Sequence, residues 1–88
     1  MTAEELPSYS EVADRQLHEL QASNPDLDND VLTVCELVFN QPGRAQAMSV
    51  AVQTPDGIVL RLPVPGRVPY KVVWTSAGPR IEAVFPHP

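Results

Sequence analysis

The residues able to do covalent chemistry are few in this chain of 88 residues. Nucleophilic catalysis needs a thiol or hydroxyl beside a base, and the sequence offers one cysteine, Cys35, and two histidines, His18 and His87. Cys35 lies in an apolar stretch, where a cysteine is most often a small buried core residue. One cysteine and two distant histidines also provide no ligand pair at a zinc-binding spacing. We therefore expect no enzyme, no catalytic residue, no metal site and no cofactor.

Three aspartates alternate in the way that a calcium-binding loop begins. Asp26, Asp28 and Asp30 occupy the first, third and fifth positions of such a loop. Val31 and Leu37 stand where the loop requires glycine and glutamate. Capping and solvation of a helix explain the three carboxylates without a metal ion.

Charge is distributed unevenly along the chain. Nine of the eleven carboxylates lie in the first forty residues against one strong base, Arg15, which is a formal charge of −8, and the remainder carries +3. Such asymmetry concerns partners and solubility. Two interpretations stay open, a merely solvated helical face or an acidic surface that docks on a basic surface of another protein. The candidate partner-binding residues are Glu11, Asp14, Glu19, Asp26, Asp28, Asp30 and Glu36.

A short segment ahead of the first helix offers a second kind of interaction. Leu6-Pro7-Ser8-Tyr9 resembles the Leu-Pro-x-Tyr variant of the motifs that WW domains bind, in which proline and tyrosine dock in aromatic-lined pockets. Leu6, Pro7 and Tyr9 are the candidate contact residues of an adaptor or assembly protein. The alternative is that Tyr9 is ordered in a helix cap.

Two helices are expected to position these side chains. Ser8-Tyr9-Ser10-Glu11 fits a capping box with Ser8 as the N-cap, and Asn24-Pro25-Asp26 is a second helix start. Apolar residues from Leu27 to Phe39 recur at helical spacing, although a strand over residues 31–39 is the competing interpretation. Asn40-Gln41-Pro42-Gly43 is expected to end the second helix.

After Gly43 the apolar period changes to two, which predicts strands. We expect four of them in an antiparallel meander, with turns at residues 54–57 and 76–79 and a proline-rich connection at 63–69. On the outer face, Val59, Val73 and Val84 lie with Arg61 and Lys71, and this partly apolar patch predicts a homodimer through the sheet. The residues expected in the core are Leu17, Leu20, Leu27, Val31, Val34, Val38, Val50, Val52, Leu60, Leu62, Val72 and Trp74.

The chain is therefore expected to be one α+β domain, residues 1–88, with two N-terminal helices packed on a four-stranded antiparallel meander. Its parts are a flexible N-terminus (1–7), an acidic helical part (8–40), the meander (44–85) and a tail (86–88). The single cysteine and the missing signal and membrane segments predict a cytoplasmic protein without a membrane span. A net charge of −5 with scattered bases argues against direct nucleic-acid binding.

The layout also resembles the phage uracil-DNA glycosylase inhibitors. The similarity covers Val59-Leu60-Arg61-Leu62, the proline-bearing loop, Tyr70-Lys71 and Trp74. It implies a small acidic DNA mimic that occupies the DNA-binding cleft of an enzyme. The chain lacks that family's Glu-Ser-Ile strand motif, is less negative and has a basic sheet, so no functional residue is transferred. The expected function is a non-enzymatic inhibitor that binds another protein.

Overall fold

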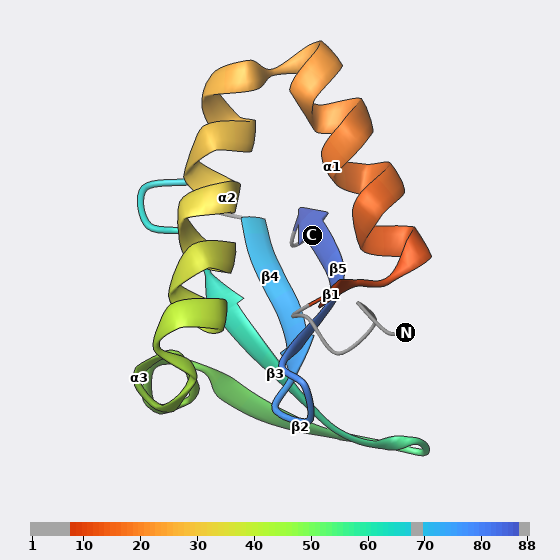
Figure 1. Ribbon diagram of the computed structural model, residues 1–88, viewed down its shortest axis with the longest axis vertical. Helices are drawn as coiled ribbons and strands as arrows, with labels where there is room; N and C mark the ends of the chain where they lie inside the picture. The colour runs from red at the N-terminus through yellow and green to blue at the C-terminus, as the bar shows by residue number, and fades with distance from the viewer. Residues whose placement is uncertain (1–7, 68–69, 87–88) are drawn as a thin grey trace, which may run out of the picture.

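The structure is a computed structural model that describes residues 8–67 and 70–86. Within these residues, helices α1 (Glu11–Ser23), α2 (Pro25–Asn40) and α3 (Pro42–Met48) precede strands β2 (Val50–Thr54), β3 (Gly57–Pro63), β4 (Tyr70–Thr75) and β5 (Arg80–Pro86) (Figure 1). Strand β1 (Ser8–Tyr9) runs parallel to β5, and the sheet order is β1-β5-β4-β3-β2. The predicted α+β class, with two N-terminal helices packed on a four-stranded antiparallel meander, is confirmed, and α3 and β1 are additions to it.

Two of the predicted segments include residues that the structure does not describe. The expected flexible N-terminus, 1–7, and residues 87–88 of the expected tail lie outside the described residues. Pro86, expected in the tail, is the last residue of β5.

The start of α1 is held by Ser10. The Ser10 Oγ accepts a hydrogen bond from the Ala13 N–H at 3.1 Å, and its hydroxyl donates to the Glu82 carbonyl. The Ser10 N–H donates to the Ile81 carbonyl at 2.9 Å. The predicted capping box with Ser8 as the N-cap is wrong, because Ser8 pairs with β5 as part of a strand and the cap falls two residues later.

Of the three described helices, α2 buries the most apolar residues in the core. Its N-cap is Asn24, whose Oδ1 accepts from the Leu27 N–H at 3.3 Å, and Pro25 occupies the first turn. The helical interpretation of residues 31–39 is confirmed, and the competing strand is wrong. Its buried side chains join those of the sheet in one cluster that includes Leu27, Val31, Val34, Val38, Leu60, Leu62, Val72, Trp74 and Ile81.

The chain does not pass directly from α2 to the sheet. Pro42 starts a further short helix, α3, because proline at the first turn of a helix loses no hydrogen bond there. Residues 44–48, expected in the meander, are therefore helical. Ser49 connects α3 to the core, since its Oγ donates to the Ala45 carbonyl at 2.7 Å and accepts from the Trp74 Nε1–H at 3.1 Å.

The β2–β3 hairpin decides which residues of β2 reach the core. Its turn, 55–56, has two residues, and Val52 lies opposite Val59. Even-numbered residues of β2 therefore share a face with odd-numbered residues of β3, away from Leu60. Val50 is 63% exposed and Val52 lies on the same face, so the predicted core positions of both residues are wrong.

A bulge in β5 changes the alternation of its side chains. Between Val73 and Trp74 the pairing slips, and Glu82 becomes an extra residue on β5. Beyond Glu82, Val84 faces the core and is buried, while Phe85 faces outward and is exposed. The prediction that Val84 lies on the outer face is wrong, because a bulge reverses the faces of the residues that follow it.

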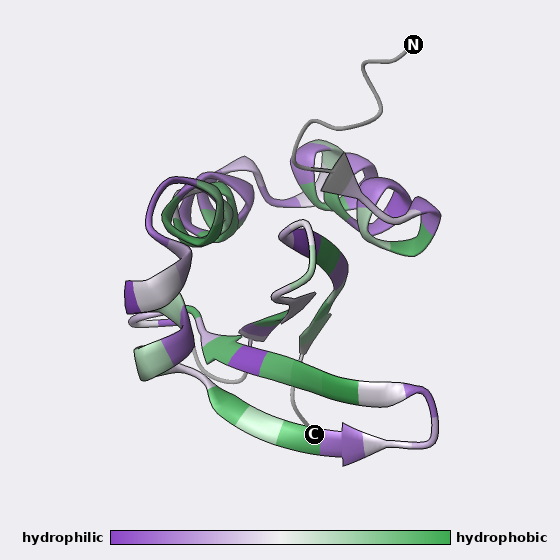
Figure 2. Ribbon diagram, turned by 60° about the horizontal axis from the view of Figure 1, so that its bottom comes forward, coloured by the Kyte–Doolittle hydropathy of each residue, from purple (hydrophilic) through white to green (hydrophobic). Residues whose placement is uncertain are grey.

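The helices lie on one face of the sheet, with α1 and α2 side by side (Figures 1 and 2). The opposite face, here called the outer sheet face, is not crossed by a helix in residues 8–67 and 70–86. The strand registers place on it Val50, Val52, Val59, Arg61, Lys71, Val73, Ala83 and Phe85.

Replacing Ser10 with alanine is expected to lower the free energy of unfolding by about 1–2 kcal/mol, because it removes the helix cap and leaves the Glu82 carbonyl without its donor. Urea unfolding of both proteins measures the difference. The matched control is Ser23→Ala, since that exposed hydroxyl bonds only to Glu19 of its own helix and its loss is worth at most about 0.5 kcal/mol. Equal effects of the two changes would contradict the role of Ser10.

Candidate interaction surface

The seven carboxylates of α1 and α2 do not form one uniform face. Five of them are exposed, and we call this set the acidic helical surface: Glu11, Asp14, Glu19, Asp26 and Glu36. The other two, Asp28 and Asp30, have different surroundings, so the sequence-based set of seven divides into three kinds of site.

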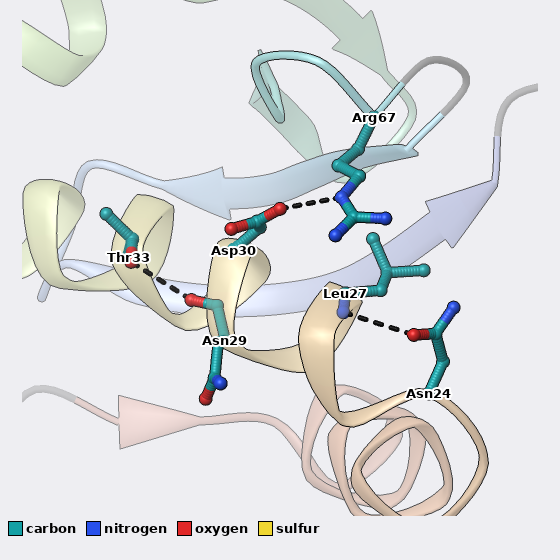
Figure 3. A network of polar contacts seen from close by, with 6 residues as sticks. All are labelled: Asn24, Leu27, Asn29, Asp30, Thr33 and Arg67. Atoms are coloured by element: carbon teal, nitrogen blue, oxygen red, sulfur yellow. Dashed lines mark hydrogen bonds and ion pairs between the residues drawn. The ribbon is translucent and has the colours of Figure 1, made fainter.

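Asp30 is neutralised within the molecule. Its Oδ2 lies 2.6 Å from the Nε of Arg67, which follows β3, and both side chains are partly exposed (Figure 3). The pair connects α2 with the loop between β3 and β4. Asp30 therefore adds little to the field that an approaching partner meets.

Asp28 is not part of the solvated face. It is 4% exposed, although it belongs to the first turn of α2. It lines a groove between α1 and α2, here called the interhelical groove. The prediction that Asp28 offers its carboxylate on the outer helical surface is wrong, because the residue next to inward-facing Leu27 turns toward α1.

The interhelical groove has a volume of about 230 Å³. Seven side chains line it, from β1, α1 and α2: Tyr9, Asp14, Leu17, His18, Gln21, Asp28 and Leu32. The groove therefore brings together two of the predicted acidic residues, Asp14 and Asp28, with the tyrosine of the predicted linear motif.

Tyr9 is engaged by the fold. It lies in β1, and its ring packs edge-on against Phe39 with the ring centroids 5.4 Å apart. Burial, with smaller effects from Cys35, Glu36 and Asp14, raises the pKa of Tyr9 to about 12, so the phenol is neutral at physiological pH. A WW domain would have to detach this ring from Phe39. Leu6 and Pro7, the other residues of the motif, lie outside the described residues.

Neither a reactive thiol nor a metal-binding cluster is found in the described part of the chain. Cys35 is fully buried, and this burial raises the pKa of its thiol to about 12, with Asp28 and Glu36 adding to the effect and Tyr9 opposing it. Within residues 8–67 and 70–86, no three His, Cys, Asp or Glu side chains are placed to hold a metal ion. No described helix combines the length and the apolar character needed to cross a bilayer.

The buried thiol makes a prediction about pH. The unfolded chain ionises Cys35 near pH 9.0, but the folded chain ionises it only near pH 12, so the folded state binds the proton more tightly between these values. The free energy of unfolding should therefore fall as the pH rises from 9.0 toward 12. Urea unfolding at a series of pH values measures the fall.

The matched variant is Cys35→Ala. In this variant the free energy of unfolding should fall less over the same pH range, because Tyr9 then remains as the group whose pKa is raised by burial. A thiol reagent at neutral pH should also react with the unfolded chain much faster than with the folded one. Equal reactivity in the two states, or an unchanged pH dependence in Cys35→Ala, would contradict the buried neutral thiol.

Sequence reasoning missed the interhelical groove. The available signal was the spacing of Asp28, Leu32 and Cys35, which places them on one side of α2, beside the stripe that faces the sheet. That side was not expected to meet α1 because the crossing of two helices is not readable from either helix alone. Comparison with models of protein families, with curated proteins and with solved structures finds no match to this chain.

Proposed function

We propose that this chain is a non-enzymatic protein-binding module, a small acidic inhibitor whose helices dock on a basic surface of a partner protein. The observation that carries the proposal is the separation of charge between the two layers. Helices α1 and α2 contain seven carboxylates and one arginine, whereas residues 41–86 contain five strong bases and two carboxylates. A partner with a basic surface is therefore attracted to one side of the molecule.

The acidic helical surface is suited to the first stage of such binding. Its five carboxylates are exposed and belong to helices that are packed on the sheet, so their spacing is held before the partner arrives. Val12 of α1 is 46% exposed beside them and offers an apolar contact. Charges then steer the encounter, and desolvation of apolar groups contributes most of the tight contact.

A basic cleft that binds nucleic acid is the class of surface that fits this proposal best. Carboxylates spaced along a rigid element imitate the phosphates of a nucleic acid, and the resemblance to the glycosylase inhibitors implies the same class of partner. Occupation of that cleft by this chain would exclude the nucleic acid.

Reversal of charge on the helices tests the proposal. In the variant Glu19→Lys with Glu36→Lys, capture of the partner from a lysate is expected to fall about tenfold or more at low ionic strength, because both exposed carboxylates become repulsive. Quantitative mass spectrometry of the retained proteins, at low and at moderate salt, measures the capture. Salt should weaken binding of the unmodified chain.

The control variant has the same net charge as the helical variant, but its substitutions lie on the sheet side of the molecule. Asp56→Lys, Gln53→Lys and Ser76→Lys together change the net charge as much as the two reversals do, at exposed positions of the turns and of β2. The control is expected to keep the partner. Retention by the helical variant, or equal loss from both variants, would reject the acidic helical surface.

A second candidate function, assembly with another copy of the chain, is favoured by the outer sheet face. This face carries exposed or partly exposed apolar side chains, among them Val50, Val73 and Phe85. Lys71 pairs with Phe85 at one end of the face, whereas Glu82 lies beside Thr75 at the other, with its Oε2 3.1 Å from the Thr75 hydroxyl oxygen. Two copies stacked with antiparallel strands would place each Glu82 over Lys71 of the other copy.

Sedimentation of the full chain over a range of concentrations tests this candidate. Phe85→Lys is expected to shift a dimer to monomer, because it places a charge in the apolar contact. Ile58→Lys is the matched control, since Ile58 is 58% exposed but shares its face with Leu60. An unmodified chain that stays monomeric, or equal effects of the two variants, would reject a dimer through this face.

A further inference from the structure

The interhelical groove contains a carboxylate that the described part of the chain leaves without a partner. Asp28 is 4% exposed, and no hydrogen bond or ion pair joins its side chain to residues 8–67 or 70–86. Removing a carboxylate from water is unfavourable unless a partner compensates for the lost hydration. The first-turn position of Asp28 supplies partial compensation, because the amide dipoles of α2 favour a negative charge there.

The rest of the groove favours a cation with an apolar stem. Asp14 adds a second carboxylate to the lining, and His18 is the only basic side chain among the described residues that line it. Leu17 and Leu32 provide apolar walls, and the neutral ring of Tyr9 provides an aromatic one. Long cationic side chains bury their methylene groups on apolar surface and place their charge against carboxylates or aromatic faces.

We propose that the interhelical groove receives an arginine side chain of the partner protein, with its guanidinium on Asp28 and its stem between Leu17 and Leu32. The inference rests on the proposed function, and it names the chemical group of the basic partner that the helices recognise. Arginine fits better than lysine, because its planar guanidinium can donate two parallel hydrogen bonds to one carboxylate. The exposed carboxylates then act in attraction, and Asp28 acts in close recognition.

A short peptide isolates this step from the unidentified partner. The isotope-labelled full chain is titrated with acetyl-Gly-Arg-Gly-amide and followed by its amide resonances. Saturable shifts are expected at groove residues, with His18, Gln21, Asp28 and Leu32 among them, and the neutral acetyl-Gly-Gln-Gly-amide should cause none. The lysine peptide is expected to bind more weakly than the arginine peptide.

Two variants test the groove in independent ways. Asp28→Asn should weaken peptide binding about ten- to a hundredfold, the loss expected for a hydrogen bond between charged groups. Gln21→Arg, at an exposed position of the lining, should supply a competing guanidinium and block the peptide even if Asp28→Asn fails to fold. The control Asp26→Asn removes an exposed carboxylate from the same helical turn and should change the affinity less than about twofold.

The outcomes separate this inference from the proposed function. Amide shifts that spread over all exposed carboxylates without saturation would overturn the proposal that the groove binds arginine. Shifts that persist unchanged in Gln21→Arg would also overturn it. If Glu19→Lys with Glu36→Lys still abolished partner capture in that case, the proposed role of the acidic helical surface would be retained and the groove proposal rejected. Saturable binding at Asp28 with partner capture unaffected by the reversals would instead retain the groove and reject the acidic surface.

Discussion

The one-sided packing of α2 on the sheet is the constraint on which the rest of the structure depends. The apolar stripe of α2 is buried with Leu62, Val72 and Trp74, and each fully buried residue of this size contributes about 1.5–3 kcal/mol. A chain of 88 residues has enough apolar residues for one such interface. The described helices therefore cover a single face of the sheet, and no helix of residues 8–67 or 70–86 crosses the other face.

This one-sided packing also divides the charges. Carboxylates on α1 and α2 can remain exposed only on the side away from the sheet, because the inward side is filled by apolar residues. Three of the five strong bases of the later segment lie in the strands: Arg61, Lys71 and Arg80. The helical layer is therefore the more acidic of the two layers.

Asp28 and Asp30, the two carboxylates that are not part of the acidic helical surface, show how packing changes the role of a charged residue. Asp30 meets Arg67 and becomes part of the link between a helix and a loop. Asp28 meets α1 and becomes the base of the interhelical groove. Both belong to the first two turns of α2, but residues two positions apart lie on different sides of a helix. Their neighbours from other segments make the difference.

The sequence by itself determined the α+β class, the helical state of residues 25–40 and most of the core, because composition, capping residues and apolar period act over a few neighbouring positions. Val31, Leu60 and Trp74 are buried as that pattern predicts. Only the tertiary structure decided the place of Val50, Val84 and Asp28. The first depends on the register of a hairpin, the second on a bulge against β4, and the third on the crossing of two helices. Each requires a contact between segments that are separated along the chain, and local propensity carries no information about such contacts.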